Sequence, residues 1–111
     1  METTQLGRTG LSVSRLGFGG APAGLTNYLG SYSPEDKQQK QQVIAALETA
    51  LDLGITYFDT AADYGDGASE RIFGEALAGT GAEIVLASKI SNRLELRASV
   101  ERSLKNLRRE Q

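Results

Sequence analysis

Short apolar or β-branched stretches alternate with amphipathic stretches along these 111 residues, and this order constrains the fold more than any other feature of the sequence. A first stretch runs from 13 to 18, and two more, at 55–58 and 84–87, each follow a helical pattern. Strands that are separated by helices pair in parallel through right-handed crossovers. The sequence therefore predicts an α/β fold with a parallel sheet.

A small hairpin is predicted at the start of the chain. Two short stretches, at 3–8 and 11–16, flank Gly7-Arg8-Thr9-Gly10, a turn whose glycines accept a positive φ. The first strand of the parallel sheet is expected from Val13 to Phe18. It ends in the segment 17–22, where glycines and a proline stop a strand and let the backbone approach a ligand closely.

The first helix is predicted to begin at Ser33, because serine can cap a helix and Pro34 is tolerated in the first turn. Two acidic residues follow and complement the helix dipole. The helical pattern ends at Gly54, which is expected to act as a C-cap. Its apolar positions recur every three or four residues and predict one face against a core; they are Val43, Ile44, Leu47, Ala50 and Leu51.

Two further helices follow the second and third strands. The second helix is predicted to be capped by Ser69 and to end at Gly79 or Gly81. The third is predicted from Asn92 and Glu95, which have the spacing of a capping box. Both have apolar stripes that are interpreted as core faces: Ile72, Phe73, Ala76 and Leu77 in the second, and Leu96, Val100, Leu104 and Leu107 in the third.

The composition excludes several classes of function. The chain has no cysteine and no histidine, which removes disulfides, thiolate metal sites, the commonest metal ligand and the commonest general base. The net charge is −2, and basic residues stand singly apart from Arg108-Arg109, so we predict no nucleic-acid binding. No run approaches the roughly 18 apolar residues of a membrane span, and no signal peptide is visible. We therefore expect a cytoplasmic protein that does not bind membranes.

Polar residues at the ends of two neighbouring strands are the best candidates for a functional site. Asp59 ends the second strand, Lys89 follows the third, and Tyr64 lies in the loop after Asp59. The carboxyl ends of parallel strands meet on one rim, and ligands of α/β proteins bind there. Neighbouring strands lie about 5 Å apart, so Lys89 is expected to reach the carboxylate of Asp59. Each residue alone would more often be an ordinary solvated surface residue, but their combination predicts a site.

Two segments of the chain resemble the aldo-keto reductase family. Residues 6–20, LGRTGLSVSRLGFGG, are similar to the amino-terminal hairpin and first strand of that family, and residues 54–65, GITYFDTAADYG, to its second strand and catalytic loop. The similarity continues through 69–77, 87–89 and 103–107. It implies a (β/α)8 barrel of the TIM type. Residues 1–111 would form a hairpin and about three βα units within a single domain of that family.

The resemblance also implies an activity. Aldo-keto reductases transfer hydride between NADP(H), or in some cases NAD(H), and a small carbonyl or alcohol substrate such as an aldehyde, ketone or sugar. Their catalytic residues are an aspartate, a tyrosine, a lysine and a histidine, and the first three fall on Asp59, Tyr64 and Lys89. No histidine is present to fill the fourth role. The resemblance implies no metal.

A mechanism follows from the resemblance. Tyr64 would donate the proton that the substrate oxygen needs after hydride transfer. The cation of Lys89 would favour the phenolate and lower the tyrosine pKa from about 10. Asp59 would pair with Lys89 and hold it in place. The backbone around Gly19, Gly20 and Ala21, together with Asp59, would contact the nicotinamide end of the cofactor.

A whole barrel needs about 250 residues, so we expect this chain to be truncated and catalytically inactive on its own. Three open parallel strands would leave an unpaired edge, which favours self-association. A non-catalytic aldo-keto reductase-like interaction or assembly module is the alternative hypothesis. The size of the native particle would distinguish it: a defined oligomer that builds a closed barrel supports this alternative, and a monomer or an amorphous aggregate counts against it.

Overall fold

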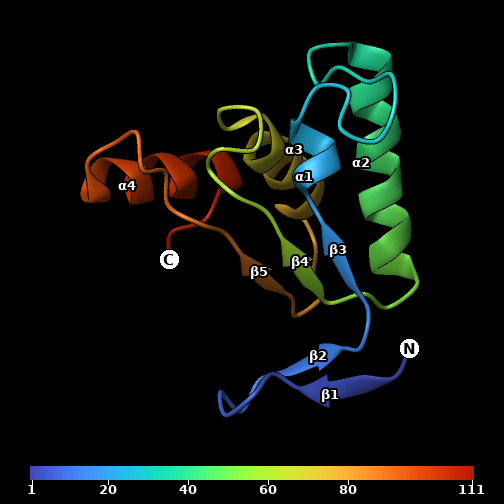
Figure 1. Cartoon of the computed structure of the whole chain (residues 1–111). Helices are drawn as coiled ribbons and strands as arrows, with labels where there is room; N and C mark the ends of the chain where they lie inside the picture. The colour runs from blue at the N-terminus through green and yellow to red at the C-terminus, as the bar shows by residue number, and fades with distance from the viewer.

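The computed structural model describes residues 1–111 and contains a two-stranded antiparallel sheet, a three-stranded parallel sheet and four helices (Figure 1). The predicted α/β order is confirmed. None of the helices is both long and apolar enough to cross a membrane. In chain order the elements are β1 (Thr3–Gln5), β2 (Ser12–Ser14), β3 (Gly17–Gly19), α1 (Ala21–Gly24), α2 (Lys37–Asp52), β4 (Tyr57–Asp59), α3 (Ala68–Leu77), β5 (Val85–Ala87) and α4 (Leu96–Leu107).

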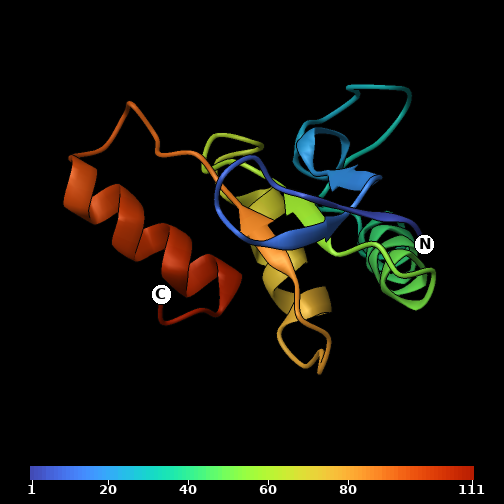
Figure 2. The ribbon, with the colours of Figure 1, turned by 90° about the horizontal axis from the view of Figure 1, so that it is seen from below.

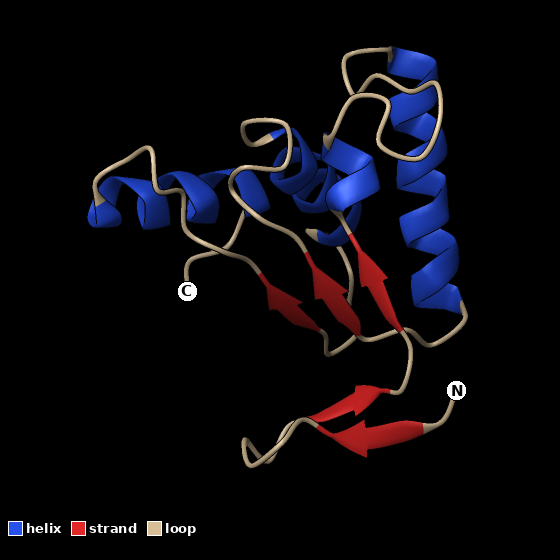
Figure 3. Cartoon of the chain, in the orientation of Figure 1, coloured by secondary structure: helices blue, strands red, loops and turns tan.

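The parallel sheet has the strand order β3-β4-β5, and its register places Gly19, Asp59 and Ala87 side by side at the carboxyl ends of the strands. The β1–β2 hairpin lies beyond the amino ends of the same strands (Figure 3). Seen from below, α3 lies between α2 and α4, and all three helices lie along one side of the sheet (Figure 2). The carboxyl ends of β3, β4 and β5 therefore form one rim, at the end opposite the hairpin.

The predicted first strand is divided between two sheets. β2 ends at Ser14 and pairs with β1, whereas β3 begins at Gly17 and pairs with β4. Between them, the backbone N–H of Ser14 donates to the hydroxyl of Thr56 at 2.8 Å, and the N–H of Thr56 donates to the hydroxyl of Ser14 at 2.9 Å. These side-chain bonds replace ladder bonds, and the strand breaks there.

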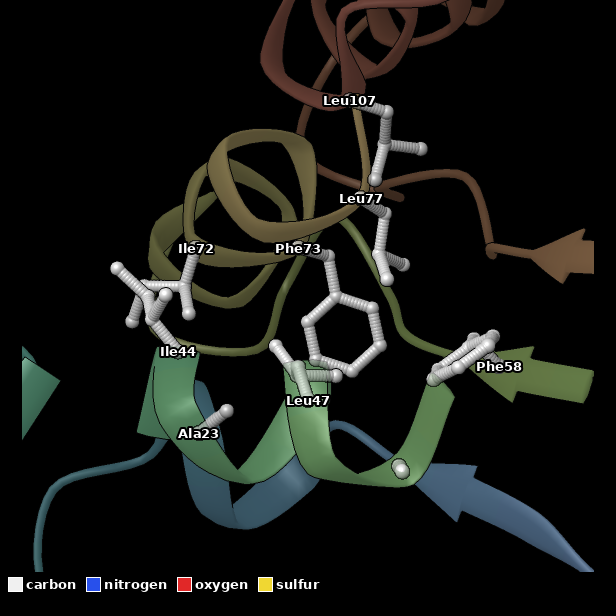
Figure 4. Close-up of a cluster of buried hydrophobic side chains, with 9 residues drawn as sticks. Ala23, Ile44, Leu47, Phe58, Ile72, Phe73, Leu77 and Leu107 are labelled. Carbon is white, nitrogen blue, oxygen red and sulfur yellow. The ribbon is translucent and has the colours of Figure 1, made fainter. Parts of the chain in front are cut away.

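The core lies between the sheet and the two helices α2 and α3. Phe58 of β4, Phe73 of α3 and Leu47 of α2 are fully buried, and Figure 4 shows them pointing toward one another. The rings of Phe58 and Phe73 meet edge to face with centroids 6.4 Å apart, a favourable aromatic geometry. Phe18 of β3 packs on both rings. The apolar stripes of the first two predicted helices are therefore confirmed as core faces.

The apolar stripe predicted for the third helix is only partly buried. Leu107 of α4 belongs to the core and Leu104 is half-buried, but Leu96 and Val100 are exposed. Periodicity shows that one face of a helix is apolar, but it does not show that another element covers the whole length of that face. The interpretation of Leu96 and Val100 as core residues was wrong.

The predicted helix starts differ from those in the structure. α2 begins after Asp36, whose carboxylate accepts from the backbone N–H of Gln39 at 2.9 Å, and not after Ser33. The backbone of Asp36 is extended, with φ −74° and ψ +118°, so the helix cannot begin before this point. α4 is likewise capped by Glu95, which accepts from two backbone N–H groups, and not by Asn92.

Glycine positions predict the end of α2 correctly but not the end of α3. Gly54 has a φ of +87° and donates its N–H to the carbonyl of Leu51, so the predicted role of this glycine in ending α2 is confirmed. α3 ends earlier than predicted, at Leu77, before either Gly79 or Gly81. It also begins at Ala68 with Gly67 as N-cap, so Ser69 lies inside the first turn and does not cap the helix.

Candidate active site

The sheet register brings Lys89 to Asp59. Asp59 pairs with Ala87, and hydrogen bonds continue beyond the strands, because Thr60 N–H donates to the carbonyl of Ala87 and Ala62 N–H donates to that of Lys89. The segments that follow β4 and β5 therefore run parallel to each other for several more residues. This extension places the side chain of Lys89 on the rim next to the carboxylate at the end of β4, as the sequence predicts.

The ammonium of Lys89 is hydrogen-bonded to three acceptor atoms. Nζ donates to both carboxylate oxygens of Asp59, at 2.9 and 2.8 Å, and to the carbonyl of Thr60 at 2.9 Å. A lysine has three N–H donors, so these three acceptors match its donors in number. The ammonium is thus held from two directions, by a carboxylate and by a backbone carbonyl.

The charge of this pair is partly exposed to solvent, with the Lys89 side chain 52% and the Asp59 side chain 37% accessible. Partial burial acts to lower the pKa of Lys89, but the hydrogen bond to Asp59 and the negative charge of Asp59 raise it, and Tyr64 adds to the rise. The net result is a pKa above the ordinary value of a lysine. Lys89 is therefore a stable cation at neutral pH.

Tyr64 lies beside this cation. The Nζ atom of Lys89 is 5.2 Å from the centre of the Tyr64 ring, within the range of a cation–π contact. The backbone of Tyr64 is fixed on both sides, since its N–H donates to Ala61 and its carbonyl accepts from Ser69. Gly24 of α1 packs directly against this carbonyl, where a Cβ atom would overlap it. The structure therefore brings the three predicted catalytic side chains together.

The predicted cofactor-contacting segment lies on the same rim, but its residues differ in exposure. Gly19 is exposed, and nothing lies within 4 Å of the position that a Cβ would take. Gly20 is buried; its N–H donates to the carbonyl of Asp59 at 2.7 Å, and its carbonyl accepts from the Ser69 hydroxyl at 2.9 Å. Ala21 begins α1 and is half-buried. Gly19 and Ala21 are thus the accessible part of this segment.

Sequence reasoning missed three residues that support the rim: Thr60, Ser69 and Glu70, all completely buried. A signal for one of them was present. Glu70 lies three residues before Phe73 and seven before Leu77, so it falls on the apolar face of α3, where a carboxylate needs buried partners. Nothing in the sequence identifies those partners, because they lie in other segments. No group of three or more His, Cys, Asp or Glu residues is arranged to hold a metal ion.

Comparison with known proteins identifies the family of the chain. The aldo/keto reductase family matches residues 15–111 of the chain. The aldo-keto reductase YhdN of Bacillus subtilis is 35% identical over 121 aligned positions, covering 96% of this chain and 34% of that protein. The holo form of an aldo-keto reductase from Bacillus halodurans superposes with a TM-score of 0.78 at 31% identity, covering 99% of this chain and 37% of that one.

A further solved structure, an aldo-keto reductase from Klebsiella pneumoniae in complex with NADPH, is also 31% identical, with a TM-score of 0.70, and covers 91% of this chain and 34% of that one. The chain spans about a third of the length of the relatives it matches. These likenesses confirm the predicted (β/α)8 barrel class, of which the chain contains the amino-terminal hairpin and three βα units. The chain belongs to the aldo/keto reductase family.

Proposed function

We propose that Asp59, Tyr64 and Lys89 are three catalytic residues of an aldo-keto reductase. The whole enzyme would transfer hydride between NADP(H), or NAD(H), and a small aldehyde, ketone, sugar or alcohol. One observation carries the proposal: the Lys89 ammonium is bonded to Asp59 and lies 5.2 Å from the ring centre of Tyr64. The complex of the Klebsiella pneumoniae relative with NADPH supports NADP(H) as the cofactor.

The chemistry suits these side chains. A bound nicotinamide cofactor supplies the hydride, and its arrival at the carbonyl carbon leaves a negative charge on the substrate oxygen. Tyr64 gives its phenolic proton to that oxygen and becomes a phenolate. Lys89 lies 5.2 Å from the ring centre of Tyr64, and its positive charge stabilises this phenolate. Asp59 keeps the ammonium on the rim.

The rim also has room for the cofactor. The flat nicotinamide ring needs an open face beside the catalytic side chains, and Gly19 provides one because no atom lies where its Cβ would be. Both backbone polar groups of Gly20 are bonded within the protein, so Gly20 would shape the site without bonding the cofactor. We assign the contact to the backbone at Gly19 and Ala21, with Gly20 behind them and Asp59 beside them.

The 111 residues alone are proposed to be inactive. They contain no histidine for the fourth catalytic role, and they span about a third of the length of their relatives. The direct test is NADPH oxidation by the purified chain with a small aldehyde, and the expected result is none above background. Turnover that is abolished by Tyr64→Phe would contradict this expectation.

The catalytic assignment is best tested in a complete barrel. Residues 1–111 would replace the matching third of the Bacillus subtilis relative YhdN, and NADPH oxidation by the chimera would be measured. Tyr64→Phe is expected to lower kcat by about 10²- to 10⁴-fold, since it removes the proton donor. Tyr57→Phe is the matched control, because Tyr57 begins β4 at the amino ends of the strands, the end opposite the rim. A folded, active chimera that tolerates Tyr64→Phe would overturn the assignment.

Self-association is a second proposal, favoured by the open edges of the sheet. β3 and β5 each pair on one side only, and unpaired edges are ready to add strands. A defined oligomer in sedimentation experiments on the isolated chain would support an assembly role. A monomer at all concentrations would count against it.

A further inference from the structure

Three polar side chains lie buried beneath the rim. Thr60, Ser69 and Glu70 are each 0% exposed, and burying a polar group costs free energy unless it is hydrogen-bonded. Their partners do not lie within one element. They lie in the loops that follow β3, β4 and β5 and in α4, so these side chains join the segments that carry the proposed catalytic and cofactor-binding groups.

Ser69 joins the first two of these loops. Its hydroxyl donates to the carbonyl of Gly20 at 2.9 Å and also lies 2.7 Å from the hydroxyl oxygen of Thr60. A serine has one hydroxyl hydrogen, and Gly20 accepts it, so Thr60 donates to Ser69. A Cβ on Gly20 would lie 2.7 Å from the Ser69 oxygen, which is why a residue without a side chain is needed there.

Thr60 carries this connection to the catalytic lysine. Its carbonyl accepts from Nζ of Lys89 at 2.9 Å, and its N–H donates to the carbonyl of Ala87 at 2.9 Å. The residue whose hydroxyl is anchored to Ser69 therefore supplies one of the three acceptors of the ammonium. A continuous chain of hydrogen bonds runs from Gly20 through Ser69 and Thr60 to Lys89.

Glu70 supports the lysine from the other side. One carboxyl oxygen accepts from the hydroxyl of Ser88 at 2.7 Å, and the other accepts from the side-chain amide of Asn106 at 3.3 Å. Ser88 immediately precedes Lys89 in the chain. Glu70 thus ties the side chain of Ser88, the residue just before the lysine, to α3 and α4.

We propose that Thr60, Ser69 and Glu70 are positioning residues, which hold the Lys89 ammonium at a fixed place relative to the backbone at Gly19–Ala21. This inference rests on the proposed function, because it concerns the groups assigned there to catalysis and cofactor contact. None of the three has to touch the substrate. Their role matters because misplacing a catalytic group by about 1 Å can cost on the order of 100-fold in rate.

The test is nitrogen-15 and carbon-13 NMR of the lysine side chains in the full 111-residue chain, without cofactor or turnover. The Lys89 ammonium is expected to be rigid, in contrast to that of exposed Lys105. Thr60→Val and Ser69→Ala should raise its mobility toward that of Lys105. Thr60→Ser retains the hydroxyl and should restore the rigid state. Ser88→Ala removes the hydroxyl that donates to Glu70 and should also raise the mobility.

Ser14→Ala is the matched control. Ser14 is also a buried serine whose hydroxyl oxygen accepts a hydrogen bond, from the backbone N–H of Thr56, but it lies beyond the amino ends of the parallel strands, away from the rim. This variant should lose comparable stability and leave Lys89 unchanged. The proposal is overturned if Lys89 is as mobile as Lys105 in the unmodified chain, a measurement that needs no variant to fold. It is also overturned if Lys89 stays rigid in folded Ser69→Ala.

The two proposals fail separately. A rigid Lys89 in a chimeric barrel that tolerates Tyr64→Phe would refute the catalytic assignment alone. A mobile Lys89 in a chimera whose activity depends on Tyr64 would refute the positioning role alone.

Discussion

Gly74 of α3 and Asn106 of α4 touch through their backbones, so closely that a Cβ atom on Gly74 would overlap the carbonyl oxygen of Asn106. The missing side chain lets the two helices approach each other. The same approach brings the amide of Asn106 to the carboxyl of Glu70. One glycine therefore sets both the docking of α4 and a contact that supports the rim beneath Lys89.

Gly74→Ala is expected to destabilise the chain by about 1–3 kcal/mol, because the overlapping atom is backbone and cannot rotate away. The intrinsic preference of a helix for alanine over glycine, about 1 kcal/mol, acts in the opposite direction and is the smaller effect. Chemical denaturation measures the difference. Gly79→Ala is the control, since nothing lies within 4 Å of its Cβ position, and its effect should stay within about 0.5 kcal/mol. An unchanged or raised stability of Gly74→Ala would contradict the close packing.

Phe73→Ala removes the ring on which Phe18 and Phe58 both pack. Deleting a fully buried phenylalanine typically costs about 3–5 kcal/mol, which is a large part of the stability of a small domain. We expect this variant to be mostly unfolded by circular dichroism at room temperature. Leu53→Ala is the control, because Leu53 is 64% exposed and should retain the native spectrum. A native-like melting curve for Phe73→Ala would show that the three-ring cluster does not hold the fold together.

The order of elements and the location of the site could be predicted from the sequence, because both depend on local patterns. The apolar runs at 55–58 and 84–87 predict strands without any knowledge of what packs on them. A polar residue directly after a parallel strand lies on the rim, because the carboxyl ends of all parallel strands meet there. Asp59 and Lys89 are therefore found from position alone, and the structure joins them.

The remaining features depend on residues distant in the chain, which local patterns do not contain. Serine is a common helix cap, but the hydroxyl of Ser69 donates to the carbonyl of Gly20, 49 residues away. Asp36 caps α2, while the backbone N–H of Ser33 donates to the side chain of Gln39, six residues away. Leu96 belongs to an apolar stripe, yet no element of the chain covers it. In each case the outcome was decided by which group came close in three dimensions.

Tyr32 is expected to ionise above the ordinary tyrosine range. Its hydroxyl donates to the carbonyl of Ala23 at 2.7 Å, and burial raises the pKa of Tyr32. A group with a raised folded-state pKa contributes stability that is fully present below its unfolded pKa, about 10 for tyrosine, and is lost as the pH rises through the folded value. The difference between ultraviolet titrations of the native chain and Tyr32→Phe isolates this phenol. A midpoint at or below about 10 would contradict the burial of the group.

The Asp59–Lys89 pair is expected to matter much more for catalysis than for stability. Both side chains are more than a third exposed, and exposed ion pairs typically contribute about 0–1 kcal/mol, so Asp59→Asn should change the free energy of unfolding by no more than that. In the chimeric barrel, by contrast, Asp59→Asn should lower kcat by at least tenfold, because it releases the ammonium that stabilises the Tyr64 phenolate.

The contribution of the Asp59–Lys89 pair to stability is expected to depend on pH, and the raised pKa of Lys89 sets the direction of this dependence. The pKa of Lys89 is raised by Asp59 and Tyr64 against the opposing effect of burial, so the contribution of the pair is fully present below the ordinary lysine pKa of about 10.4 and disappears as the pH rises through the folded-state value. The stability difference between the native chain and Asp59→Asn should therefore be constant from neutral pH to about pH 9 and shrink above the lysine pKa. Denaturation at a series of pH values measures it, with Glu75→Gln as the matched control, because Glu75 pairs with Lys40 between α2 and α3, away from the rim. A difference that instead grows at alkaline pH would mean that Asp59 does not hold the cation of Lys89, and the charge assigned to the catalytic site would have to come from another group.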